Sequence, residues 1–108
     1  MNELNINRVE LSGVVGSVTS VECKGVAIVQ FTLKTERTVM LKPSGEVVLE
    51  STWHSVHTTQ IDADELNAGM KVYVKGFLRN DKYMGSDGVQ RVVTVVIARE
   101  CEIMDTEE

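Results

Sequence analysis

The chain has few of the features that give small proteins covalent stability, and none that would place it in a membrane. Its 108 residues include two cysteines and one proline. Cys23 and Cys101 lie far apart, and residues 1–7 do not resemble a secretory leader, so we expect free thiols. A disulfide would require a fold that brings their Cα atoms close together. The longest apolar run, 92–98, is strand-length and far below the ~18 residues of a spanning helix. These absences indicate a soluble, cytoplasmic protein.

The chain also lacks a basic excess. It has 11 lysines and arginines against 16 aspartates and glutamates, for a net charge of −5. Proteins that bind nucleic acid usually carry the opposite balance. The acids gather at 62–65 and 105–108, however, whereas 71–82 holds four basic residues and a single acid, Asp81. A local basic surface on an acidic protein is still able to contact phosphates.

Motifs for catalysis and metal binding are missing as well. There is no Gly-x-Ser-x-Gly, no glycine-rich phosphate loop ending in lysine and no His-Glu-x-x-His. Residues 85–88 predict a turn, because no helix follows them. His54 and His57 are three residues apart on a predicted strand and therefore point to opposite faces. We expect no enzymatic activity, no cofactor and no metal site.

What is present is period-two alternation of apolar and polar residues between glycine-bearing turns, which is typical of an all-β domain. We expect a single domain over 1–108, with flexible ends at 1–6 and 105–108. Gly13 and Gly16 interrupt the first strand and predict a bulge or bend there. Long loops are expected at 38–46 and 80–90, and the predicted strands are 7–22, 26–37, 47–59, 70–79 and 91–104.

A single helical candidate, 62–66, falls between the third and fourth predicted strands. Asp62 and Glu65 resemble a capping box, and 67–69 supplies a stop. Five strands with one short helix at this position match the OB fold, a five-stranded Greek-key barrel. In that fold oligonucleotides lie across the second and third strands and between the long loops.

The alternation also predicts which residues share a face. On the third strand Trp53 lies with Ser55 and His57, opposite His54 and Val56. The other predicted apolar groups are Val9, Leu11, Val15 and Val21 on the first strand, Ala27, Val29, Phe31 and Leu33 on the second, and Val72, Val74 and Leu78 on the fourth. Residues 91–98 are almost continuously apolar, so both faces of the last strand should be covered.

Several short blocks resemble the bacterial single-stranded DNA-binding proteins, in the family's order and spacing from Asn7 to about Met104. They are 7–16 (NRVELSGVVG), 31–35 (FTLKT), 52–56 (TWHSV), 69–79 (GMKVYVKGFLR) and the hairpin at 87–88 followed by Arg91. The resemblance implies an OB domain that assembles as a tetramer and wraps single strands in replication, recombination and repair. It also implies bacterial or phage origin and association with the nucleoid.

The chain departs from the family in four respects. It has no tryptophan near Thr38 and no further aromatic residue near Thr59, and the predicted helix is short. Residues 104–108 carry no acidic tail with an apolar tip, the segment through which the family docks replication and repair partners. We therefore expect a divergent member, of phage or mobile-element origin, or a truncated chain.

The predicted DNA-binding residues combine flat aromatic rings with cations. The resemblance places Trp53 at a base-stacking position, Tyr83 near a second one and Arg8 at a backbone contact. The alternatives are that Trp53 packs in the core and that Tyr83 only pins its own loop. The full predicted set is Arg8, Lys34, Arg37, Trp53, Ser55, Arg79, Lys82, Tyr83 and Arg91.

A stripe of cations and aromatic residues along the fourth strand allows two interpretations. Alone, it resembles a nucleic-acid surface, and Arg79, nearest the loop, is assigned to DNA. The resemblance instead implies that His54 and Tyr73 lie where subunits meet, so we expect Lys71 and Phe77 to join them at a subunit interface. His54 is expected to be hydrogen-bonded there.

Two functions therefore remain open. The first is sequence-independent binding of single-stranded DNA by a homotetramer, together with replication or repair proteins. The second is a dimeric primosome-accessory or protein-interaction OB module that binds DNA weakly.

Overall fold

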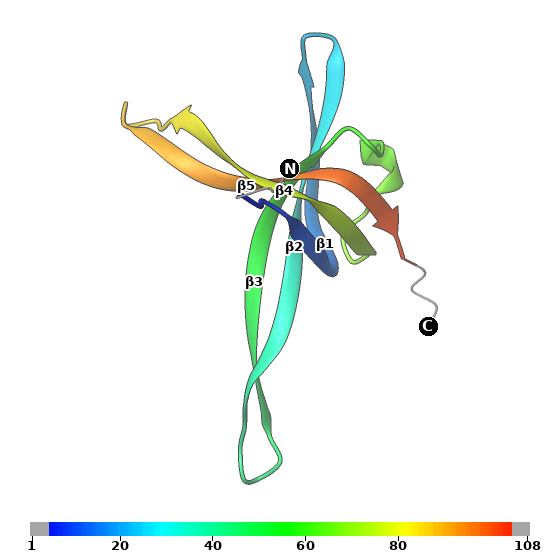
Figure 1. Ribbon diagram of the computed structural model, residues 1–108, viewed down its shortest axis with the longest axis vertical. Helices are drawn as coiled ribbons and strands as arrows, with labels where there is room; N and C mark the ends of the chain where they lie inside the picture. The colour runs from blue at the N-terminus through cyan, green and yellow to red at the C-terminus, as the bar shows by residue number, and fades with distance from the viewer. Residues whose placement is uncertain (1–4, 105–108) are drawn as a thin grey trace.

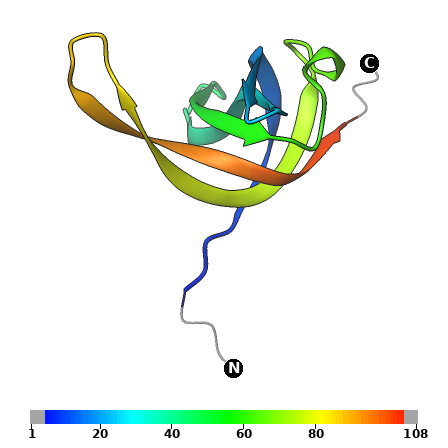
Figure 2. The same cartoon turned by 90° about the horizontal axis from the view of Figure 1, so that it is seen from above.

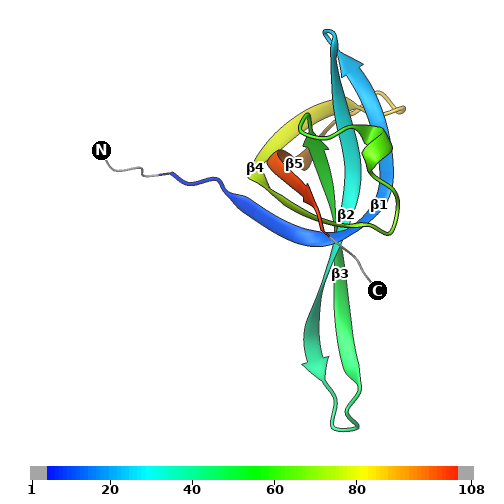
Figure 3. The same cartoon turned by 90° about the vertical axis from the view of Figure 1, so that its right-hand side faces the viewer.

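The computed structural model describes residues 5–104, and its strands close into one barrel (Figures 1 and 3). The barrel order is β1-β2-β3-β5-β4, with β3 and β5 parallel and the other neighbours antiparallel. This confirms the predicted all-β OB barrel. The elements are β1 (Val9–Cys23), β2 (Val26–Leu41), β3 (Val47–Thr58), the 3-10 turn η1 (Ala63–Glu65), β4 (Lys71–Met84) and β5 (Gln90–Ile103). The ends predicted to be flexible, 1–6 and 105–108, fall outside 5–104 except for residues 5 and 6.

The core forms where the alternating apolar residues of the strands face inward. Leu33, Val56, Val72 and Val74 are each 0% exposed. Phe31, Val29 and Val15 belong to the same cluster, as the alternation predicted, together with Leu66, Val96 and Ala98. Burying such side chains contributes roughly 1.5–3 kcal/mol each. The inward positions therefore fix which residues point outward.

The predicted helix is a single 3-10 turn. The backbone N–H of Asp62 donates to Oε1 of Glu65 at 3.0 Å, so the capping prediction is confirmed. The prediction of a helix over 62–66 was too long, because Leu66 already has extended dihedral angles (φ −112°, ψ 136°). Leu66 is only 3% exposed and belongs to the core cluster. No helix within 5–104 is long and apolar enough to cross a bilayer.

The β2–β3 and β4–β5 hairpins extend beyond the barrel as arms; Figure 1 shows both, and Figure 2 shows the β4–β5 arm from above. The predicted loops at 38–46 and 80–90 were wrong, because pairing continues to Leu41–Val47 and to Met84–Gln90. Only tight turns remain; the N–H of Gly45 donates to Lys42 O at 2.8 Å, and that of Gly85 to Val89 O at 2.9 Å.

The arms explain the wrong burial predictions. Val92 and Val93 are 59% and 38% exposed, and Leu78 is 45% exposed, because no second layer covers the β4–β5 arm. Val21, also predicted to be apolar and inward, is 44% exposed near the end of β1. The predicted bend in β1 is confirmed, since its register with β2 shifts between Val15 and Val18. The cysteines are free, as predicted.

Candidate nucleic-acid interface

Polar side chains form a ladder on the outward face of β2 and β3. Three cross-strand pairs face each other there: Lys34 with Trp53, Thr32 with Ser55, and Gln30 with His57. They point outward because the intervening residues, such as Phe31, Leu33 and Val56, fill the core. The predicted common face of Trp53, Ser55 and His57 is therefore present.

The side chain of Trp53 is open to solvent. It is 57% exposed, which excludes the alternative that it packs in the core. The Nζ atom of Lys34 lies 5.9 Å from the centroid of its indole ring, within the range of a cation–π contact. Beneath the ring, β1 carries Gly16; a Cβ atom there would lie 2.5 Å from Cζ3 of Trp53. The ladder thus presents an aromatic ring with a cation beside it.

A groove runs along this face. One depression of about 170 Å³ lies over Ser17, Thr32 and Ser55, and a second of about 320 Å³ lies toward β4. Both include Gln30 and His57, so they adjoin. Burial lowers the pKa of His57 below 6.5, outweighing the smaller opposite effect of Asp81. His57 is therefore neutral at pH 7 and has one donor and one acceptor nitrogen.

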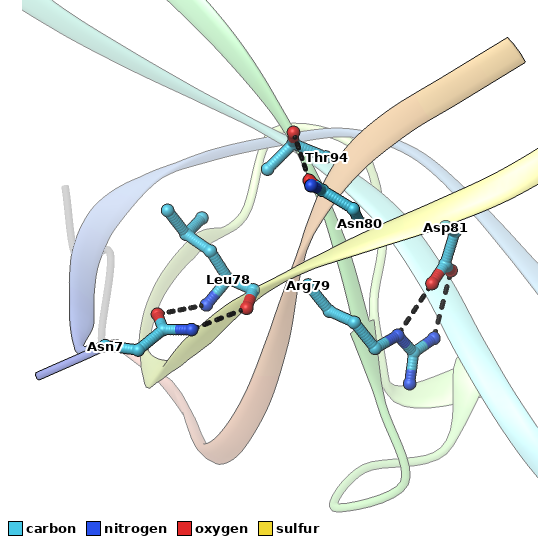
Figure 4. A network of polar contacts seen from close by, with 6 residues as sticks. All are labelled: Asn7, Leu78, Arg79, Asn80, Asp81 and Thr94. Carbon is cyan, nitrogen blue, oxygen red and sulfur yellow. Dashed lines mark hydrogen bonds and ion pairs between the residues drawn. The ribbon is translucent and has the colours of Figure 1, made fainter. Parts of the chain in front are cut away.

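Arg79 and Asp81 border the groove from β4. The Nε and Nη2 atoms of Arg79 donate to the two carboxylate oxygens of Asp81 at 2.7 and 3.0 Å (Figure 4). This ion pair lowers the pKa of Asp81 and raises that of Arg79. The residues of the predicted stripe on β4 lie in two different places. Arg79 lies at the groove, whereas the ring of Phe77 lies under Arg99, with its centroid 5.4 Å from the guanidinium carbon.

The other predicted DNA-binding residues lie away from this groove. Arg37 pairs with Glu50 at 2.9 Å on the β2–β3 arm. On the β4–β5 arm, Arg91 pairs with Asp87 at 2.8 Å. That arm also carries Lys82 and Tyr83, and Tyr83 is 50% exposed and paired in register with Arg91 rather than placed in a loop. Arg8 borders a separate depression of about 700 Å³, together with Lys75, Phe77 and Arg99.

The predicted interface residues occupy two places. Nε2 of His54 lies 2.9 Å from Oγ1 of Thr35 in the same chain, and burial lowers its pKa; its predicted place at a subunit interface stays a prediction. Tyr73 donates its hydroxyl to Glu10, which raises the pKa of Tyr73 to about 12. Lys71 shares the outward side of β4 with Tyr73. Within 5–104, no hydrogen bond or ion pair joins His54 to these β4 residues.

Sequence reasoning missed part of the groove. Gln30 and Thr32 were assigned no role, although they alternate with Val29, Phe31 and Leu33 and therefore lie on the outward face of β2. His57 was placed on the face of Trp53, but the only role considered for it was that of a metal ligand, and the described residues contain no group of three or more His, Cys, Asp or Glu suited to a metal ion. Asp81 was counted only as a charge, because it was expected in a loop and not on a strand bordering the groove.

Comparisons with known proteins agree with this geometry. The chain matches the model of the single-strand binding protein family over residues 6–104. It is 36% identical over 106 residues to a single-stranded DNA-binding protein of Xanthomonas campestris, covering 92% of this chain and 60% of that protein. The corresponding protein of Xylella fastidiosa is 30% identical, with 92% of this chain and 63% of that protein covered. The chain thus spans about three fifths of the length of these relatives.

Solved structures share the fold. A Plasmodium falciparum SSB in complex with single-stranded DNA superposes with a TM-score of 0.75 at 23% identity, covering 97% of this chain and all (100%) of that one. A deletion mutant of the single-stranded DNA-binding protein from Thermus aquaticus gives 0.74 at 20% identity, covering 94% of this chain and 51% of that one.

Proposed function

The chain belongs to the single-strand binding protein family, and from that premise we propose that its β2–β3 groove binds single-stranded DNA by base stacking and backbone charge contacts. The binding requires no fixed sequence and involves no catalysis. It serves replication, recombination or repair, at exposed DNA in the cytoplasm.

One observation carries the proposal: an exposed indole with a cation beside it lies on the same outward face of β2 and β3 as the polar groove. Trp53 is 57% exposed, and the Nζ atom of Lys34 is 5.9 Å from its ring. Base stacking on an aromatic side chain contributes ~1–3 kcal/mol and tolerates any base. An ammonium group beside the ring is placed to meet the phosphate next to the stacked base.

Further contacts follow from the groove and the arms. Beyond Trp53 the groove is lined by Ser55 and, toward β4, by Arg79. The remaining predicted residues lie on surfaces that a longer strand would reach from the groove; they are Arg8, Arg37, Lys82, Tyr83 and Arg91. A single stacked base gives weak binding, so these residues or avidity between subunits must supply the remainder.

We propose that the avidity comes from a homotetramer, in which several subunits bind one DNA strand. The subunits contact one another through His54, Lys71, Tyr73 and Phe77. Tyr73 and Phe77 are half-buried on the outer side of β4, and Lys71 is exposed beside them. Light scattering of the free protein tests this assembly. A tetramer is expected, whereas a dimer would favour the accessory module with weak DNA binding and a tighter protein partner.

The direct test is a titration with oligo-dT. Trp53 is the only tryptophan in the chain, so quenching of its fluorescence reports on this position. Anisotropy of labelled oligo-dT should show affinity falling roughly 5- to 150-fold in Trp53→Ala, which corresponds to ~1–3 kcal/mol. Trp53→Phe should keep part of the affinity, and Tyr83→Ala serves as a comparison on the arm. Equal binding by Trp53→Ala and the parent protein would overturn the site assignment.

A further inference from the structure

At its β4 end the groove deepens into a pocket of about 320 Å³. Its apolar lining includes Val21 and Ile28 from the β1–β2 hairpin, and Ile97 and Ala98 from β5. The volume is at the lower limit of pockets that hold small ligands. Building on the proposed function, we propose that this pocket receives one unstacked nucleobase of the bound strand and prefers guanine.

The lining favours a base over a phosphate. Asp81 keeps its negative charge at neutral pH, because the guanidinium of Arg79 holds its pKa below the ordinary value. That carboxylate repels a phosphate. It also takes up N–H donors of Arg79, the guanidinium that would otherwise bind a phosphate. Apolar walls with a few convergent polar groups are instead the usual surroundings of a splayed-out base.

The polar groups present acceptors and donors side by side. An ionised carboxylate has about four lone-pair sites, and Asp81 uses one on each oxygen for Arg79. Arg79 has five N–H donors and gives two of them to Asp81, so the others remain for a ligand. Gln30 and neutral His57 border the same pocket and add further donors and acceptors. The pocket is therefore equipped to read the edge of a base.

Guanine fits this arrangement better than the other bases. Its Watson–Crick edge carries two adjacent donors, N1–H and N2–H, for the lone pairs that Asp81 leaves free, and beside them O6, which a guanidinium recognises. Thymine offers one N–H between two carbonyl groups. Adenine and cytosine each offer an amino donor next to an unprotonated ring nitrogen, which the carboxylate would repel. Asp81 with Arg79 thus selects for guanine.

The test uses labelled oligo-dT of ~8 nucleotides, within the span of one OB domain. A single dG, dA or dC replaces dT at each position in turn, and affinity is measured by anisotropy at fixed salt. One well-placed dG is expected to tighten binding by about fivefold or more, since a bidentate base contact discriminates by ~1–3 kcal/mol. Substitution by dA or dC is expected to give no such gain.

Asp81→Asn should abolish the preference for dG, because it replaces the carboxylate that accepts the N–H groups of guanine. Circular dichroism and thermal unfolding show whether this variant is folded. The matched control is Asp87→Asn, which breaks a similar ion pair, with Arg91 at 2.8 Å, at the tip of the same arm and should keep the preference.

The outcomes separate the two proposals. If oligo-dT binds and quenches Trp53 but dG gives no gain at any position, the guanine pocket is wrong and the proposed function stands. A dG preference that survives in Asp81→Asn also overturns the pocket. If no oligonucleotide binds, both proposals fail.

Discussion

At the scale of single residues, the position of Trp53 depends on the glycine beneath it. A Cβ atom at Gly16 would lie 2.5 Å from Cζ3 of the indole and 2.6 Å from Oγ1 of Thr32. These are distances that atoms do not adopt, so both contacts must be relieved by movement of the indole, of Thr32 or of the strand that carries Gly16. The indole is exposed and is freer to move than Thr32, because Thr32 Oγ1 accepts the N–H of Ser17 at 2.9 Å.

We therefore expect Gly16→Ala to displace the Trp53 ring while the barrel persists. Affinity for oligo-dT should fall by about fivefold to tenfold, part of the ~1–3 kcal/mol of one stacked base. Fluorescence of the free protein should change as well, because the indole leaves its present surroundings. Anisotropy and emission spectra measure the two effects.

Gly13→Ala is the comparison for this prediction. Its Cβ atom would lie 2.1 Å from the backbone oxygen of Lys34, so the strand itself must shift. The free energy of unfolding should fall by ~1–3 kcal/mol, as for other overpacked sites. If Gly16→Ala bound oligo-dT as tightly as the parent protein, binding would not depend on the present position of the Trp53 ring, and the prediction would be wrong.

The residue scale also shows how far the sequence predicts the site. Polar neighbours two residues away predicted that Trp53 is exposed, since alternation decides facing on a strand within a barrel. Asp81 could not be placed in this way. Its approach to His57 depends on how the β4–β5 arm leaves the barrel, which is a property of three-dimensional curvature and not of local pattern.

At the scale of elements, a side-chain amide holds the base of the β4–β5 arm. It forms the pair of hydrogen bonds with β4 that a neighbouring strand's backbone would form. Nδ2 of Asn7 donates to Leu78 O at 2.8 Å, and Leu78 N–H donates to Oδ1 of Asn7 at 2.8 Å (Figure 4). The β1–β4 ladder ends at Val9 and Gly76, so the amide continues it by one further pair. Arg79 is the next residue along β4, so this contact also bears on the groove.

Asn7→Ala is expected to lower the free energy of unfolding by about 1–2 kcal/mol, because each hydrogen bond contributes ~0.5–1.5 kcal/mol. The amide proton of Leu78 should exchange faster with solvent, since its acceptor is lost. Urea unfolding at one fixed protein concentration and amide exchange by NMR measure these effects. Asn5→Ala, on the exposed segment before β1, is the control. Unchanged exchange at Leu78 would contradict the role given to Asn7.

The elements show where sequence reasoning succeeds and where it fails. The five strands were found because alternation persists wherever one face is buried. Their outer ends were misjudged in both hairpins. In 38–41 and 91–93 the apolar residues do not alternate, because neither face of an arm beyond the barrel is buried. Val92 at 59% exposure shows that a continuous apolar run does not require cover on both faces.

At the scale of the whole molecule, the charge balance bears on how the groove binds. The chain carries a net charge of −5, and both Lys34 beside Trp53 and Arg79 at the groove are already paired. Lys34 lies 3.5 Å from Glu36, and Arg79 lies 2.7 Å from Asp81. A phosphate that binds either cation must compete with a carboxylate. Stacking and other uncharged contacts should therefore contribute more of the affinity than counterion release.

This balance predicts a shallow dependence on salt. For an oligo-dT of ~8 nucleotides, the log–log slope of affinity against salt should be shallower than about −2, the value for roughly three neutralised phosphates. Glu36→Gln frees Lys34 next to Trp53, so affinity should rise at low salt and the slope should steepen by about 0.7. Glu102→Gln makes the same change in charge beside Tyr73, outside the groove, and should leave the slope unchanged. A slope that steepens equally in both variants would mean that net charge, and not the freed ammonium group, governs binding.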